Sequence, residues 1–235
     1  MALVKFGGGV IQMSGSIAGN TYARNRFGNY VRSRTKPTNP KSAQQVAIRA
    51  SIASLADRWS QVLDDAKRQS WNLYGASVNM KNRLGETVNL TGFNHFIRSN
   101  AIKCVYKKTL SDDGPGIFEL PGQDPEMAVT ATEDPQQISV AYDKDRAWND
   151  ETGGFLWVYQ GVPQNAQRNF FAGPWRLLGS VIGETGVPVA SPLVATPQFP
   201  IAEGQRLWVY ARIQRADGRL SEIFRADCFV TENGA

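Results

Sequence analysis

Acidic residues are absent from the first 56 positions of this 235-residue chain, and Asp57 is the first carboxylate. The same segment holds eight basic residues. Residues 57–125 hold nine basic and eight acidic residues, and residues 126–235 hold nine basic and thirteen acidic residues. The net charge of +5 therefore comes from a basic front end joined to a mildly acidic second half. This asymmetry predicts an acidic partner for the front end, either nucleic acid or an acidic protein surface, including the C-terminal half of another copy.

Long apolar runs are absent as well. No stretch approaches the ~18 apolar residues of a membrane span, and the start, MALVKFGGGVIQMSGSIAGN, lacks the apolar core of a signal peptide. We therefore expect no membrane partner. The only two cysteines, Cys104 and Cys228, lie far apart, so we expect free, buried thiols of a protein made in a reducing cytoplasm, with a disulfide as the alternative.

Residues that carry catalysis or bind metals are scarce. His95 is the only histidine, and no nucleophile elbow, P-loop or dinucleotide fingerprint occurs, so FGGGV at 6–10 reads as a turn. One histidine and two distant cysteines give no zinc site. The acidic segment DKDRAWND, 143–150, lacks the glycine and distal glutamate of a calcium loop and reads as a solvated connection. We expect no enzymatic activity, no metal and no cofactor.

Residues 1–38 are predicted to form an extended basic arm of short strands and turns. In YARNRFGNYVRSR, a three-residue loop at 27–29 would set Arg24 opposite Arg32 on one face, whereas a two-residue loop would divide the arginines between both faces. Like charges opposite one another are unfavourable, so a shared face would need an acidic partner. The candidate interaction residues are Tyr22, Arg24, Arg26, Phe27, Tyr30, Arg32, Arg34 and Lys36.

Three interpretations of the arm remain open at this point. Arginines with interleaved aromatic rings suit nucleic acid, because the charges pair with phosphates and the rings stack on bases. The same residues suit protein assembly, because arginine and tyrosine anchor interfaces and a flanking arm can add strands to a neighbour. An ordinary solvated hairpin is the third reading. We favour assembly, because no helix-turn-helix or other nucleic-acid-binding pattern surrounds the arm.

Residues 39–110 are predicted to form a small unit of three helices. The first follows Asn39 as N-cap and Pro40, with apolar residues at helical spacing, and the second follows Asp64 or Asp65 and ends at Gly75. The third follows Thr91, and NRLGETVNL between the last two reads as a turn or small hairpin. The side chains expected to face inward are Ile48, Ile52, Leu55, Trp59, Val62, Leu63, Trp71, Tyr74, Phe93, Phe96, Ile97 and Cys104.

Residues 111–127, rich in Pro, Gly and Asp, are predicted to be a linker, and residues 128–235 to form a β-sandwich of about seven short strands. In QRLWVYARIQRADGRLSEIF, alternate residues from Leu207 to Ile213 fall on one apolar face, and those from Trp208 to Arg212 fall on the other. The tripeptide ADG makes a hairpin turn. The fold class is therefore α+β: an extended β-arm, a three-helix unit and a sandwich.

Two resemblances follow from these motifs. LWVYARIQRADGRLSE is similar to the last two strands of fibronectin type III domains, over residues 128–232. That family's core tryptophan would be Trp157, and its corner tyrosine is replaced by Leu207. Residues 5–103, with GSIAGNTYARNRFGNYVRSRTKPTNPKSAQQ, KRQSWNLYG and NRLGETVNLTGFNHF in that order, resemble proteins encoded in tailed-phage structural gene regions.

The second resemblance implies a virion component synthesised in the host cytoplasm. The function expected is a non-enzymatic structural protein, either a capsid decoration or minor head protein that docks through its arm. A tail or head–tail joining component and a nucleic-acid-binding protein are the alternatives. The expected partners are major capsid or tail subunits and copies of the chain itself, with nucleic acid as the less favoured partner.

Overall fold

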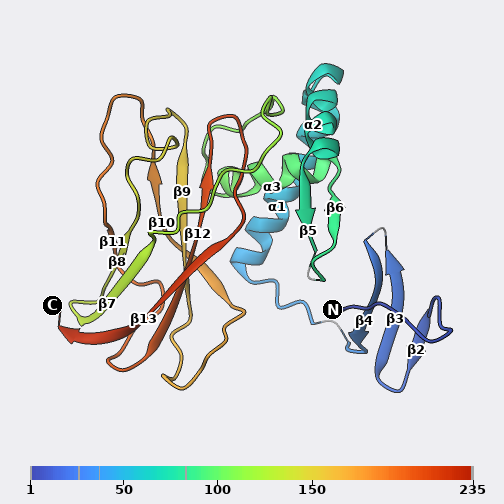
Figure 1. The fold of residues 1–235 in the computed structure, drawn as a ribbon, viewed down its shortest axis with the longest axis horizontal. Coiled ribbons are helices and arrows are strands. Elements are labelled where there is room, and N and C mark those ends of the chain that lie inside the picture. The colour runs from blue at the N-terminus through green and yellow to red at the C-terminus, as the bar shows by residue number, and fades with distance from the viewer. Residues whose placement is uncertain (1, 26, 37, 83, 234–235) are drawn as a thin grey trace.

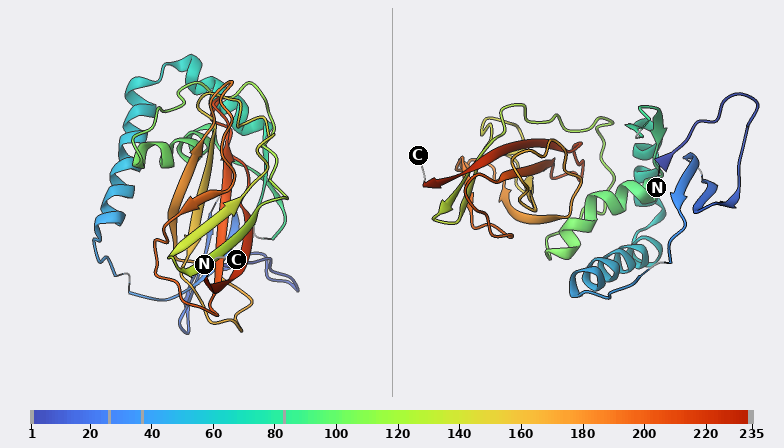
Figure 2. Two further views of the ribbon diagram at one scale, coloured as in Figure 1. Left: turned by 90° about the vertical axis from the view of Figure 1, so that its left-hand side faces the viewer. Right: turned by 90° about the horizontal axis from the view of Figure 1, so that it is seen from below.

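The computed structural model describes residues 2–25, 27–36, 38–82 and 84–233. They form a mixed α+β protein in three parts: a small N-terminal sheet, a helical unit, and a β-rich domain (Figure 1). The helical unit lies between the other two, and the right-hand view of Figure 2 shows the same order. Within these residues, no helix has both the length and the apolar character that crossing a bilayer requires.

The arm is an antiparallel sheet with the strand order β1-β4-β3-β2. No arm residue that the structure describes is buried, so this sheet has no core of its own. Small sheets without a buried apolar face are marginally stable, and this one depends on what lies beside it. Its strands are β1 (Ala2–Leu3), β2 (Gly15–Ile17), β3 (Asn20–Asn25) and β4 (Gly28–Ser33).

The helical unit contains the three predicted helices and the predicted hairpin. Its elements are α1 (Ala43–Asp57), the π-helical continuation η1 (Arg58–Val62), α2 (Asp65–Ser77), β5 (Asn79–Lys81), β6 (Thr87–Asn89) and α3 (Gly92–Val105). The predicted caps of α2 and α3 are confirmed, since Asp64 accepts a hydrogen bond from Lys67 N (2.8 Å) and Thr91 accepts one from Asn94 N (3.3 Å).

Two predicted helix boundaries are wrong. Asn39 and Pro40 do not start α1, because Lys41 has a φ of 50°, and Ser42 is the N-cap instead. Gly75 does not end α2, which continues to Ser77. A Cβ at Gly75 would lie 2.7 Å from the Leu90 carbonyl oxygen, so this glycine permits close packing inside the helix rather than a helix stop.

The β-rich domain has one sheet of seven strands, ordered β10-β9-β12-β13-β7-β8-β11. β13 pairs antiparallel with β12 along its first half and parallel with β7 along its second, and the end strands β10 and β11 contact each other. The sheet therefore bends around a shared apolar core. The strands are β7 (Ala128–Asp134), β8 (Gln137–Ala141), β9 (Phe155–Gly161), β10 (Trp175–Ile182), β11 (Leu193–Ala195), β12 (Arg206–Gln214) and β13 (Phe224–Asn233).

The side chains of β12 alternate between the two faces of the sheet as predicted. Trp157, however, does not lie in the core of the β-rich domain, as its resemblance to the fibronectin type III tryptophan implied. Leu207 and Ile213 lie in the core of the β-rich domain, as expected. On β9, Leu156 and Val158 point into that core, which leaves Trp157 on the outer face of the sheet. Trp157 is nevertheless only 1% exposed, because the helical unit covers it.

Polar side chains join α3 to this outer face. The Trp157 indole N–H donates to Gln214 Oε1 (2.9 Å), and Gln214 Nε2 donates to the Ser99 carbonyl oxygen (2.6 Å). Arg98 donates to the carbonyl oxygens of Leu220 (2.5 Å) and Ser221 (2.8 Å). Because these partners are mostly buried, the contacts fix the helical unit and the β-rich domain in one relative orientation.

The segment at 111–127 contains no regular element in the structure, yet its start is firmly held. Ser111 exchanges two backbone hydrogen bonds with the Asn100 side chain (2.8 and 2.9 Å), and the Asp112 carbonyl oxygen accepts one from the Trp71 indole (2.9 Å). Arg58 binds the Asp112 carboxylate with two hydrogen bonds and holds its pKa below the usual range. This connection therefore packs against the helices instead of separating two mobile domains.

Candidate protein-interaction site

The register of the β3–β4 hairpin decides where the arm presents its charges. Asn25 pairs with Gly28, so of the two loop lengths left open by the sequence the structure has the two-residue loop. Arg24 then lies opposite Asn29, and Arg32 lies opposite Thr21. Since alternate pairs point to opposite faces, Arg24 and Arg32 project from opposite sides of the sheet. The single basic face expected from the longer loop does not form, because a one-residue change of register reverses every side chain.

The other candidate residues are spread over both faces and the ends of the sheet. Tyr22 pairs with Val31 and shares a face with Arg24, whereas Tyr30 pairs with Ala23 and shares a face with Arg32. Both tyrosines and Phe27 are half-buried, whereas the side chains of Arg24, Arg32, Arg34 and Lys36 are exposed. Arg26 lies outside the described residues.

The arm's cations have no carboxylate partners in the described part of the chain. The only side-chain contact of Arg24 there is a hydrogen bond of 3.4 Å to Gln12, and Arg32, Arg34 and Lys36 have no ion pair. Lys5 is the exception, since its Nζ lies 2.5 Å from Glu86 of the helical unit and ties the arm to the loop after β5. The charges predicted to seek an acidic partner therefore have none among the described residues, apart from that of Lys5.

A second exposed surface, missed from the sequence, lies on the first turns of α1. Ile48 and Ile52 were expected to face inward, but each is 43% exposed, and Val46 is 50% exposed. Further along the same stripe Leu55 and Leu63 are buried, and α3 packs against α1, whereas Val62, which was also expected to face inward, is 62% exposed. The arm and the start of α1 are consecutive along the chain, so the basic and apolar surfaces adjoin in sequence.

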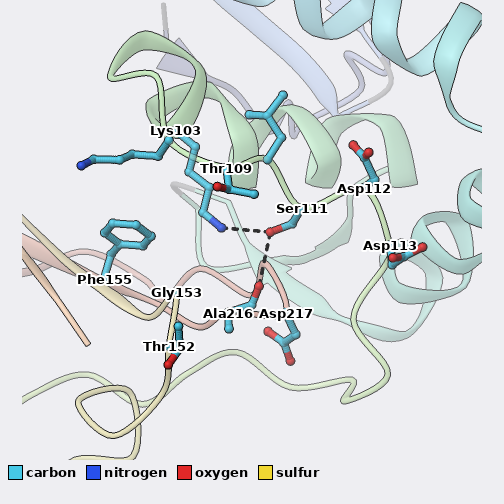
Figure 3. A pocket seen from close by; sticks show the side chains of 12 residues that line it. Lys103, Thr109, Ser111, Asp112, Asp113, Thr152, Gly153, Phe155, Ala216 and Asp217 are labelled. Carbon is cyan, nitrogen blue, oxygen red and sulfur yellow. Dashed lines mark hydrogen bonds between the residues drawn. The ribbon is translucent and has the colours of Figure 1, made fainter. Parts of the chain in front are cut away.

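A cavity with a volume of about 530 Å³ lies between the end of α3, residues 108–113 and the loops at 152–153 and 216–217 (Figure 3). Inside it, Lys103 Nζ donates to Ser111 Oγ (2.9 Å), and that hydroxyl donates to the Ala216 carbonyl oxygen (3.4 Å). Burial lowers the pKa of Lys103, and the negative charges of Asp217 and Glu151 partly offset this decrease.

A serine beside a lysine of lowered pKa is the pairing used by Ser–Lys nucleophiles. In this cavity the lysine is the donor and the serine proton points to a carbonyl oxygen, which is the reverse of the path that activates a serine. The pair joins α3 to the turn after β12, and we interpret it as structural.

Other reactive groups are similarly enclosed. His95 is completely buried and packs edge-on against the Tyr74 ring (4.9 Å between centroids), and neither ring nitrogen has a hydrogen-bond partner among the residues that the structure describes. Burial, followed by the charge of Arg98, lowers the pKa of His95 to about 4, so the imidazole is neutral at pH 7 and cannot reach a substrate. Cys104 and Cys228 are free thiols, as predicted, but both are half-buried rather than buried, and burial raises the pKa of Cys228 to about 11.

Comparisons with known proteins identify no family. No family model and no curated protein matches the chain. Among solved structures, the adhesin domain of Epf from Streptococcus pyogenes is similar over 49% of this chain, with 12% identity and a TM-score of 0.29. The match spans only 34% of that adhesin structure. A TM-score this low carries no argument, so the function is inferred from the residues themselves.

Proposed function

We propose that this protein is a non-enzymatic structural component of a tailed-bacteriophage particle, a capsid decoration or minor head protein that docks through its basic arm onto an acidic protein surface. The observation that carries the proposal is the state of the arm. It is a sheet without buried residues, and Arg24, Arg32, Arg34 and Lys36 have no described carboxylate partner. Such a segment gains most of its stabilising contacts from a neighbour.

The resemblance of residues 5–103 to proteins from tailed-phage structural regions supports the placement in a virion. The β-rich domain supports it by analogy only. Its strands can be read as two layers, β10-β9-β12-β13 and β7-β8-β11, joined through β13, which suits a sandwich of the immunoglobulin or fibronectin type III kind. Such modules commonly project from particles or cover seams, where many weak contacts repeated by symmetry stabilise a shell.

Protein is favoured over nucleic acid as the partner because of the hairpin register. Arg24 and Arg32 point to opposite faces, so the arm offers no continuous basic track for a phosphate backbone. Exposed apolar side chains on the adjoining start of α1, including Ile48 and Ile52, also suit a protein surface. A tail or head–tail joining role uses the same arm and differs only in the partner subunit.

Charge removal in the arm tests this proposal. The variant Arg24→Gln, Arg32→Gln, Arg34→Gln is expected to bind purified particles about 100-fold more weakly, because truncating interfacial charges costs a few kcal/mol in total. Its melting temperature should match that of the wild type, since these side chains are exposed and unpaired in the described chain. Sedimentation with separated heads and tails, and with empty shells that lack genome, measures the binding.

The matched control is Lys81→Gln, Lys107→Gln, Lys144→Gln, which removes the same charge from exposed lysines elsewhere. Equal loss of binding in both variants would reduce the effect to net charge and refute a specific arm site. Binding to tails alone would show that the protein is a tail component rather than a head component. Binding that disappears on genome-free shells and falls steeply with salt would favour nucleic acid instead.

A further inference from the structure

A second cavity, of about 330 Å³, lies between α1, α3 and the outer face of the sheet at β9, β10 and β12. Its volume is within the range of small-molecule sites in proteins. The helices form one wall and the sheet forms the other, so residues far apart in the sequence share the cavity. It is separate from the arm, and the inference drawn from it does not rest on the proposed function.

Aromatic side chains form much of the wall of this cavity. Trp157, Tyr159 and Trp175 project from the sheet, and Tyr106 projects from the end of α3. The rings of Tyr106 and Trp157 lie 6.3 Å apart with an angle of 30° between their planes. Burial raises the pKa of both Tyr106 and Tyr159, so these walls are uncharged at neutral pH. Flat, neutral walls of this kind favour a ligand with an aromatic body.

Two arginines, Arg98 and Arg212, also line the cavity, and their environments differ. Arg98 is fixed by its hydrogen bonds to backbone carbonyl oxygens, and its Nη2 lies 3.9 Å from the Glu222 carboxylate. Burial, followed by the charge of Arg212, lowers the pKa of Arg98 to about 10, which leaves it charged at pH 7. Two guanidinium groups thus act on each other beside an aromatic wall.

Arg212 has no compensating partner among the described residues. Its Nε is buried without a hydrogen-bond acceptor, and the side chain makes no ion pair or hydrogen bond there. Arg212 as a whole is half-buried, and a buried guanidinium N–H without an acceptor lowers stability because its lost hydration is not replaced. Such groups are rare unless a ligand or water supplies the missing acceptor.

We propose that this cavity binds a small aromatic carboxylate, with the carboxylate accepting hydrogen bonds from Arg212 and the ring packing between the helices and the aromatic wall. Guanidinium and carboxylate form paired, charge-assisted hydrogen bonds that strengthen where water is excluded. The nearby charge of Arg98 adds to the attraction without giving up its own backbone contacts. The ligand class follows from charge complementarity and from the aromatic lining.

Titration calorimetry with 2-naphthoate, and with neutral 2-naphthamide as its uncharged counterpart, tests this proposal on the full chain. The carboxylate is expected to bind at least tenfold more tightly than the amide. Arg212→Met should abolish that preference. Arg176→Met, on the neighbouring strand β10 and outside the cavity, should preserve it within twofold. Equal affinities for the two compounds, or no binding of either at millimolar concentration, would overturn the proposal without affecting the role of the arm.

The stability of Arg212→Met provides an independent readout. Without ligand, its melting temperature should equal or exceed that of the wild type, because the variant removes a charge that nothing in the described chain compensates. A fall of several degrees would instead make Arg212 a structural residue and contradict the assignment. Adding 2-naphthoate should raise the melting temperature of the wild type and leave that of Arg212→Met unchanged.

Discussion

Replacing Trp157 by alanine is expected to lower the free energy of unfolding by about 4 kcal/mol, because a completely buried indole is removed and a cavity remains. The loss includes the hydrogen bond to Gln214, which in turn connects to Ser99 of α3. Trp157 packs with Phe155 and Leu220 between the sheet and the helical unit, so the variant weakens both at once. Urea unfolding followed by circular dichroism measures the change.

The conservative variant Trp157→Phe keeps most of the aromatic packing and removes the hydrogen bond to Gln214. It keeps an aromatic ring beside Phe155 but loses the indole N–H and part of the packed ring, so a loss of about 1–2 kcal/mol, smaller than that of Trp157→Ala, is expected. If the helical unit and the β-rich domain form one cooperative body, the wild type unfolds in a single transition. Two separate transitions, with only one of them shifted by Trp157→Ala, would show that the two parts fold independently and would contradict the interface described above.

Acidification from pH 7 to pH 4 is expected to destabilise the protein by about 3 kcal/mol through His95 alone. The pKa of His95 is lowered from 6.5 to about 4 in the folded chain, first by burial and then by Arg98. Between these two values the unfolded chain binds the proton and the folded chain does not. Stability is therefore complete above pH 6.5, falls as the pH drops through this window, and loses nothing further from this residue below pH 4.

The variant His95→Leu isolates this contribution, because carboxylates such as Asp112 also titrate at low pH. Leucine fills a similar volume and has no ring nitrogen, and in the wild type both ring nitrogens lack hydrogen-bond partners within the described part of the chain. The difference in unfolding free energy between wild type and variant should change by about 3 kcal/mol from pH 7 to pH 4. A difference that stays constant over that range would mean that His95 is solvated or paired in solution.

Local signals were sufficient for much of the secondary structure. Asp64 and Thr91 were identified as caps because an oxygen at that position satisfies an unpaired backbone N–H, whatever the rest of the fold does. The alternation along Leu207–Ile213 likewise assigned each side chain of β12 to the correct face, because a strand repeats every two residues. The absence of acidic residues before Asp57 also indicated a segment without ion-pair partners of its own. In the structure, Lys5 of this segment pairs with Glu86 of the helical unit.

The sites depended on contacts that local patterns do not encode. The register of β3 and β4 was ambiguous, because either of two loop lengths fits the same residues, and the shorter loop sends Arg24 and Arg32 to opposite faces. The resemblance to fibronectin type III domains implied a core position for Trp157, which instead lies buried on the outer face, because a sequence motif cannot tell which side of a sheet another unit will cover. The cavity beside Arg212 could not be anticipated, since its walls come from distant elements.

By itself, the sequence determined the order of a basic arm, a helical unit and a β-rich domain, together with the charge difference between front and back. These properties depend on composition and on short-range periodicity. Only the tertiary structure decided that the helices dock on the outer face of the sheet, that Ile48 and Ile52 stay exposed, and that Arg212 lies beside a cavity without a described acceptor. Those outcomes depend on which apolar surfaces meet, and burial is a property of the assembled fold rather than of any one segment.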